Sequence, residues 1–129
     1  MNAQIVVADD QQEVLDMLIR SLQVDGRKVK AFPSGSQALA YVEKNVSEVD
    51  MVILDLDFGP GEPDGLEILR QMREDAPDLP IIMLTGKGTV ETAVAALGLG
   101  ATDFIEKDFY VEDRLELSLE KLDRMFTVL

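Results

Sequence analysis

Short apolar segments alternate with amphipathic segments along the whole chain. The apolar segments, such as Ile5–Ala8 and Met51–Leu54, are only four residues long, which is too short for a helix and typical of buried strands. In the segments between them, apolar residues recur at spacings of three and four, as on one face of a helix. From about Gln12 to Asp25 this spacing predicts the first helix, with Gly26 as its stop signal.

Five strands, each followed by a helix, account for the whole pattern. Strands that alternate with helices form a parallel sheet with helices on both faces, so we predict a doubly wound α/β fold. A length of 129 residues fits one such domain, spanning residues 1–129. The predicted strands are Ile5–Ala8, Lys28–Phe32, Met51–Leu54, Ile81–Leu84 and the region of Phe104–Ile105, and the helices begin near Gln12, Ser34 or Ser36, Leu66, Val90 and Val111.

The composition narrows the chemistry that this fold can perform. The chain has no Cys and no His, which excludes disulfides, thiolate metal sites and every mechanism that needs a histidine base. Twenty-five acidic residues face 12 basic ones, a net charge of −13, so this domain alone is not expected to bind nucleic acid or an anionic membrane. No secretory signal or membrane-length apolar segment is visible, and we expect a cytoplasmic protein.

Polar residues directly follow four of the five predicted strands. In an open parallel sheet, functional sites form beyond the carboxyl ends of the strands, so these side chains are expected to converge. Each residue taken alone has an ordinary explanation, such as a helix cap or a surface charge. The converging set is Asp9, Asp10, Asp55, Asp57, Thr85 and Lys107.

Clustered carboxylates need a cation or raised pKa values. Two carboxylates ~4 Å apart repel each other by roughly 4 kcal/mol at an effective dielectric constant near 20. Oxygen ligands without His or Cys favour Mg²⁺, Ca²⁺ or Mn²⁺, and Mg²⁺ is the usual partner of phosphoryl transfer. Asp55 is the candidate nucleophile, because a carboxylate can form an aspartyl phosphate, and Thr85 and Lys107 suit the phosphoryl oxygens.

Five sequence segments carry a resemblance over nearly the whole chain. They are VVADD, DMVILDLD, DGLEIL, PIIMLTG and GATDFIEK, in this order. Together they resemble a response-regulator receiver domain of two-component signalling. The resemblance implies a flavodoxin-like sheet with the strand order 2-1-3-4-5. It also implies that the protein is a signalling switch and not an enzyme. Such a switch catalyses only its own phosphotransfer and its own slow autodephosphorylation.

The resemblance further implies a role for each site residue. Asp55 accepts a phosphoryl group from the phosphohistidine of a sensor histidine kinase or a phosphotransfer protein. Asp10 and Asp55 hold Mg²⁺, or Mn²⁺, directly, Asp9 assists through water, and the carbonyl of Asp57 is a further ligand. The remaining assignments are Thr85 and Lys107 as binders of the phosphoryl oxygens, Phe104 as the aromatic switch, and the Asp57 side chain with Lys87 as residues that tune dephosphorylation. Phe104 has a second interpretation, as a strand aromatic that only packs.

Two local departures from the family pattern stand out. Asp108 replaces the proline that usually follows the last strand's lysine, so we expect a trans peptide or a remodelled loop there, because a cis peptide without proline costs ~3–4 kcal/mol. The loop after Asp55, with Gly59, Pro60 and Pro63, is about two residues longer than usual.

Two other functions remain open. The DLD of Asp55–Asp57 and the segment IIMLT also resemble motifs of haloacid-dehalogenase-type phosphohydrolases. By that resemblance, Asp57 would be the general acid and base. Two features oppose this function: Asp9–Asp10 come before the DLD, whereas that family has its acidic pair last, and the chain is short for a catalytic core with a substrate cap. Alternatively, a receiver-like domain can signal without phosphorylation, purely as an interaction module.

The last helix carries a further pattern, an apolar seam suited to a homodimer. Its heptad spacing is typical of a coiled-coil contact, although packing on the sheet explains the first turns equally well. The last residues are also a candidate linker helix to an output domain outside this chain. The seam consists of Val111, Leu115, Leu119, Leu122, Phe126 and Leu129.

Overall fold

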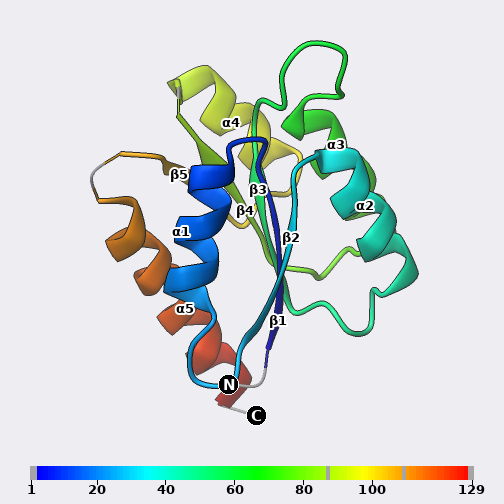
Figure 1. Cartoon of the computed structure of the whole chain (residues 1–129). Coiled ribbons are helices and arrows are strands. Elements are labelled where there is room, and N and C mark those ends of the chain that lie inside the picture. The colour runs from blue at the N-terminus through cyan, green and yellow to red at the C-terminus, as the bar shows by residue number, and fades with distance from the viewer. Residues whose placement is uncertain (1–2, 87, 109, 128–129) are drawn as a thin grey trace.

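The fold is a five-stranded parallel sheet with the strand order β2-β1-β3-β4-β5 (Figure 1), as the resemblance implied. The computed structural model describes residues 3–86, 88–108 and 110–127. Each of the five predicted strands is present, within one or two residues of its predicted ends. The strands are β1 (Gln4–Ala8), β2 (Lys28–Phe32), β3 (Met51–Asp55), β4 (Ile81–Thr85) and β5 (Asp103–Glu106).

Helices cover both faces of the sheet, as the alternating pattern predicted. One face carries α1 and α5, and the other carries α2, α3 and α4 (Figure 1). None of the helices in the described part of the chain is long and apolar enough to cross a membrane. The helices are α1 (Gln12–Leu22), α2 (Gly35–Lys44), α3 (Gly65–Asp75), α4 (Val90–Gly98) and α5 (Val111–Thr127).

Successive residues of the central strands enter opposite cores. In β3, Val52 and Leu54 join the core beneath α2, α3 and α4, whereas Met51 and Ile53 join the core beneath α1 and α5. All residues of β3 and β4 are buried, which explains why these segments are apolar without alternation. Edge strand β2 is different, because Lys28 and Lys30 are exposed there.

The first helix ends three residues before its predicted end at Asp25. The amide of Gln23 still donates to the Ile19 carbonyl, but the next amide, of Val24, donates back to Leu22. Asp25 then adopts a left-handed backbone with a φ of 54°, which no helix can continue. The turn signal therefore begins before Gly26, at residues that the helical spacing had included.

Helix α4 shows the limits of the spacing rule in another way. Val90, Val94 and Leu97 predicted this helix correctly, yet their exposed fractions are 81%, 65% and 52%. The only buried side chain of α4 is the small Ala96. Apolar spacing therefore located the helix, whereas the tertiary contacts decided which of its sides is covered.

Asp108 is compatible with a trans backbone, as expected. There is no cis peptide among the described residues. The Asp108 carboxylate accepts a hydrogen bond from the Tyr110 amide at 2.9 Å and pairs with Arg114 at 2.8 Å. These contacts explain what an acidic residue does at this position: it organises the turn that leads into α5.

Candidate functional site

The carboxyl ends of four neighbouring strands bring the predicted polar residues to one edge of the sheet, which is the top edge in Figure 1. Asp9 directly follows β1, Asp55 ends β3, Thr85 ends β4 and Lys107 directly follows β5. The parallel register aligns these ends, since Asp55 pairs with Leu84 and Thr85 with Glu106. A cavity of about 250 Å³ opens here, lined by Asp10, Gln11, Asp55, Asp57, Gly59, Thr85, Gly86 and Lys107.

Burial separates the polar residues of this edge into two groups. Asp9, Asp55 and Thr85 are only 1%, 4% and 3% exposed. Asp10 and Asp57 are exposed at the mouth of the cavity. The site thus has a buried floor with two carboxylates and an open rim with two more.

The ammonium group of Lys107 joins the two buried carboxylates. Its Nζ lies 2.5 Å from Asp9 Oδ2 and 3.1 Å from Asp55 Oδ1. Burial alone would lower the pKa of Lys107, but its contacts with Asp9 and Asp55 outweigh burial and hold that pKa above its ordinary value. Lys107 is therefore a fixed positive charge at the floor of the site.

The negative charge of ionised Asp55 remains unfavourable even with Lys107 beside it. Burial and the nearby charge of Asp9 raise the pKa of the Asp55 carboxyl from 3.8 to about 6. Lys107 and a 2.9 Å hydrogen bond from the Leu56 amide act in the opposite direction without cancelling the rise. Two buried negative charges thus share one positive charge, and an additional cation would stabilise them.

The acidic residues also meet the geometric requirement for such a cation. Asp9, Asp10 and Asp55 each offer one carboxylate oxygen, and these three oxygens lie within 4.8 Å of one another. A set of hard oxygen ligands without nitrogen or sulfur fits Mg²⁺, Mn²⁺ or Ca²⁺. The resemblance implied Mg²⁺ or Mn²⁺, and these three carboxylate oxygens are suitable ligands for such an ion.

The predicted switch and tuning residues lie around this core. Phe104, in β5, is partly buried and packs against the core beneath α2, α3 and α4, close to Gly88. The carboxylate of Asp57 accepts a 2.9 Å hydrogen bond from the Gly59 amide. Lys87, the other predicted tuning residue, lies outside the described residues, so its role stays a prediction.

Gln11 is a site residue that the strand-end argument missed. Its side-chain oxygen, Oε1, accepts a hydrogen bond from Lys107 Nζ at 3.5 Å. Its main-chain amide donates a hydrogen bond to Asp9 Oδ1 at 2.9 Å. It lies three residues beyond the end of β1 and directly before α1, where its only sequence signal was its place after Asp9–Asp10. A neutral residue at a helix start has many ordinary explanations, so this signal was weak.

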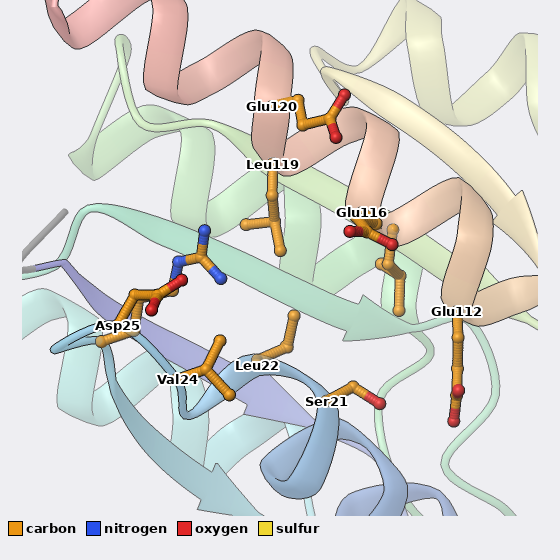
Figure 2. A pocket seen from close by; sticks show the side chains of 10 residues that line it. Ser21, Leu22, Val24, Asp25, Glu112, Glu116, Leu119 and Glu120 are labelled. Atoms are coloured by element: carbon orange, nitrogen blue, oxygen red, sulfur yellow. The ribbon is translucent and has the colours of Figure 1, made fainter.

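A second hollow lies away from the strand ends, between the end of α1 and α5 (Figure 2). Leu22 and Leu119 extend toward each other across it, with Glu116 and Glu120 along the α5 side. Beside it, Arg27 pairs with Asp123 at 3.2 Å, which ties the chain after α1 to α5. None of the residues predicted for phosphoryl chemistry lines this hollow.

The described part of the apolar seam packs inside the domain. Leu115 and Leu119 are buried in the core beneath α1 and α5. The side chains of Leu122 and Phe126, and all of Leu129, lie outside the described residues. The packing interpretation is therefore correct for the first turns of α5, while dimerisation stays a prediction.

Comparisons with known proteins identify the family. The profile described as "Response regulator receiver domain" matches residues 5–119. The regulatory protein VanRc of Enterococcus gallinarum is 37% identical over 109 residues, which make up 84% of this chain and 45% of VanRc. The chain spans less than half the length of the first curated relatives that it matches.

Solved structures give the same answer for the fold. A receiver domain protein of Clostridium thermocellum aligns with a TM-score of 0.85 and 27% identity, covering 98% of this chain and 99% of that one. A response regulator from Burkholderia pseudomallei with a phosphorylated aspartic acid, calcium ion and citrate aligns with a TM-score of 0.77 and 26% identity, covering 92% of this chain and 72% of that one. The chain belongs to the response regulator receiver domains, the phosphorylation-dependent signalling switches of two-component systems.

Proposed function

We propose that Asp55 accepts the phosphoryl group, and that the donor is the phosphohistidine of a sensor histidine kinase or of a phosphotransfer protein. A carboxylate oxygen of Asp55 forms a bond to phosphorus while the phosphorus–nitrogen bond of the donor breaks. The bonding electron pair leaves with the donor's imidazole, which takes up a proton. The products are an aspartyl phosphate and a free histidine side chain.

The position of Asp55 at the floor of the open cavity carries this proposal. Asp55 contacts the partly buried Lys107 and lines the cavity together with Thr85, and the cavity gives a phosphoryl donor access to it. Lys107 and Thr85 face the same cavity, where they bind the phosphoryl oxygens and offset the charge that spreads over them during transfer. The similar Burkholderia regulator carries a phosphorylated aspartic acid, which supports an aspartate as the phosphoacceptor.

Mg²⁺, or Mn²⁺, is the proposed cofactor, and the acidic set fits it. Asp10 and Asp55 would hold the ion directly, Asp9 would assist through water, and the main-chain carbonyl of Asp57 would be a further ligand. When bound, the ion neutralises negative charge on the carboxylates and on the transferring phosphoryl group. Lys107 keeps Asp9 and Asp55 together before the ion arrives, as its two contacts indicate.

Phosphorylation changes the interaction surface through Thr85 and Phe104 in this proposal. Thr85 moves toward the phosphoryl group, and Phe104 turns inward into the space that Thr85 leaves. The partial burial of Phe104 supports this part of the proposal. Asp57 and Lys87 tune how quickly water removes the phosphoryl group. Asp57 lines the cavity, and Lys87 directly follows the cavity residue Gly86 in the sequence.

A small acyl phosphate tests the phosphoacceptor directly. With Mg²⁺ present, the intact protein should gain one phosphoryl group by mass spectrometry, and Asp55→Asn should gain none. Asp75→Asn, an exposed acid at the end of α3, is the matched control and should label like the unmodified protein. Full labelling of Asp55→Asn would rule out the assignment. Rapid turnover of a generic phosphomonoester would instead favour the phosphohydrolase.

The proposal for the complete protein is a cytoplasmic regulator that acts as a homodimer through α5 and passes the signal to an output domain. The heptad spacing from Leu115 to Leu129 supports the dimer, and the greater length of the curated relatives supports the output domain. Light scattering over a concentration series, with and without phosphodonor, should show a dimer that phosphorylation strengthens. A monomeric mass in both states at high concentration would refute the dimer.

A further inference from the structure

Helices α2 and α3 begin in the same way. Each starts with a buried glycine, Gly35 or Gly65, directly after a capping residue. Ser34 accepts a hydrogen bond from the Gln37 amide at 3.1 Å, and Asp64 accepts one from the Glu67 amide at 2.9 Å. The two helix starts therefore form a natural pair for comparison.

The two glycines differ in what a side chain would meet. A Cβ atom at Gly35 would lie 2.9 Å from two atoms of buried side chains, Cγ1 of Ile68 and Cε2 of Phe58. A Cβ atom at Gly65 would fall on the main chain of the phosphoacceptor strand: it would overlap the carbonyl oxygen of Asp55 and lie 2.7 Å from the Cα of Leu56. Buried side chains can shift at a cost in core packing, whereas relief at Gly65 requires displacement of the main chain at the strand end.

Gly65 is also bonded to the strand end that it touches. Its amide donates to the Leu56 carbonyl at 2.7 Å. This bond closes the base of the long loop after Asp55, so residues 57–64 leave the sheet and return to it at one fixed point. Farther out in the loop, a Cβ at Gly61 would meet nothing within 4 Å. The additional loop length is thus accommodated away from the strand end.

We propose that Gly65 is a positioning residue for phosphoryl transfer: because it lacks a side chain, the start of α3 can lie directly on the Asp55–Leu56 main chain and fix the Asp55 carboxylate relative to Lys107 and Asp9. The inference rests on Asp55 being the phosphoacceptor. Gly65 acts through Asp55 and does not touch the phosphoryl group. Its backbone does not have the positive φ found at Gly59 and Gly61, so close approach is the reason for glycine here.

Three alanine substitutions separate positioning from stability. Gly65→Ala must move the end of β3 or the start of α3, and misplacement of reacting groups on the order of 1 Å can cost ~100-fold in rate. We therefore expect its rate of phosphorylation by a small acyl phosphate, at saturating Mg²⁺, to fall at least ~10-fold. Gly35→Ala should lower the melting temperature but label at the normal rate. Gly98→Ala, with open space at its Cβ, should label at the normal rate and should not lower the melting temperature.

All rates are compared at a temperature where circular dichroism shows each variant to be folded. The inference is overturned if folded Gly65→Ala is labelled as fast as Gly35→Ala. A failure of the proposed function looks different, because the unmodified protein would then not be labelled at Asp55 at all. The two ideas can therefore fail independently.

The two capping residues provide a second test that adds no atom at the contact, and it decides the matter if Gly65→Ala does not fold. Asp64→Ala loosens the start of α3, and Ser34→Ala loosens the start of α2 by the same loss of one capping bond. Asp64→Ala should slow labelling severalfold more than Ser34→Ala does. Asp64→Asn, which keeps a capping oxygen but loses the charge, should label normally. Equal rates for Asp64→Ala and Ser34→Ala would contradict the inference.

Discussion

Asp55 at the end of β3 and Glu67 in the first turn of α3 are both carboxylates that contact a cationic side chain. Asp55 lies 3.1 Å from Lys107, and Glu67 lies 2.6 Å from Arg70. Burial and the Asp9 charge nevertheless raise the pKa of Asp55 to about 6, whereas hydrogen bonds from Arg70 and Gln71 lower the pKa of exposed Glu67 to about 2. The neighbouring cation lowers the pKa of the carboxyl at both places, but at Asp55 burial and the Asp9 charge outweigh it.

Different exposure to water explains why the pKa values of the two carboxyls shift in opposite directions. On α3, water screens the charges of Glu67, Arg70 and Glu74, so their contacts cost little and stabilise little. At the strand ends, burial removes water from Asp9 and Asp55, and Lys107 only partly replaces it. The buried cluster holds an unfavourable charge arrangement that an additional cation can relieve.

Removal of the Lys107 charge should have the largest effect on stability. Lys107→Met keeps much of the apolar stem but leaves Asp9 and Asp55 buried without their cation, which we expect to lower the free energy of unfolding by about 2 kcal/mol at pH 7 without metal. Urea unfolding measures it. Lys44→Met, at an exposed position at the end of α2, is the control and should leave the midpoint unchanged. Equal midpoints for the two variants would show that Lys107 does not balance the buried acids.

Neutralising Asp55 should stabilise the metal-free protein. A carboxyl whose pKa is raised from 3.8 to about 6 by folding binds more protons in the folded state between these pH values, so stability falls as pH rises through this window. The cost is fully present above pH 6. Asp55→Asn should therefore gain about 1–2 kcal/mol at pH 7 and lose this part of the pH dependence. An unchanged stability profile between pH 4 and 7 would contradict the buried-acid account.

Mg²⁺ should stabilise the protein through Asp10, with a somewhat smaller effect. At a Mg²⁺ concentration ten times the dissociation constant, binding to the folded state alone adds about 1.4 kcal/mol. Asp10→Ala should lose most of this gain, and its metal-free form should be at least as stable as the unmodified protein, because one repelling acid is gone. Thermal melts with and without Mg²⁺ provide the measurement. If Mg²⁺ raised the melting temperature of Asp10→Ala as much as that of the unmodified protein, the ion would have to bind at another site.

The exposed cluster on α3 should give the smallest effect. Arg70→Ala removes both ion pairs, with Glu67 and Glu74, but all three side chains are in contact with water. We expect no measurable change in the urea midpoint at pH 7, at low or high salt, and normal phosphorylation. A destabilisation comparable to that of Lys107→Met would erase the contrast between the two clusters.

The sequence predicted the strands and the strand-end residues because both follow from local patterns. A strand buried on both sides must be apolar, and its end is visible where polarity returns, as at Asp9 and Asp55. The exposed side of α4 could not be predicted, since spacing does not say which neighbours a helix has. The strand order came from the resemblance and not from the spacing.

Other features of the site depend on contacts between residues far apart in the chain. Gln11 meets Lys107 across 96 residues, and nothing near either residue in the sequence indicates it. The raised pKa of Asp55 depends on its burial against Asp9, which only the folded sheet creates. The sequence could place Gly65 near the start of a helix, but it could not predict that this glycine lies against the main chain of Asp55.

Direct mapping of the phosphorylated residue tests the central claim best. After treatment with an acyl phosphate and Mg²⁺, borohydride converts the acyl phosphate of an aspartyl residue into an alcohol, which fixes the position permanently. Peptide mass spectrometry should find the reduced residue at Asp55 and leave Asp9, Asp10 and Asp57 unmodified. Reduction at any of these three acids, with Asp55 intact, would contradict the account.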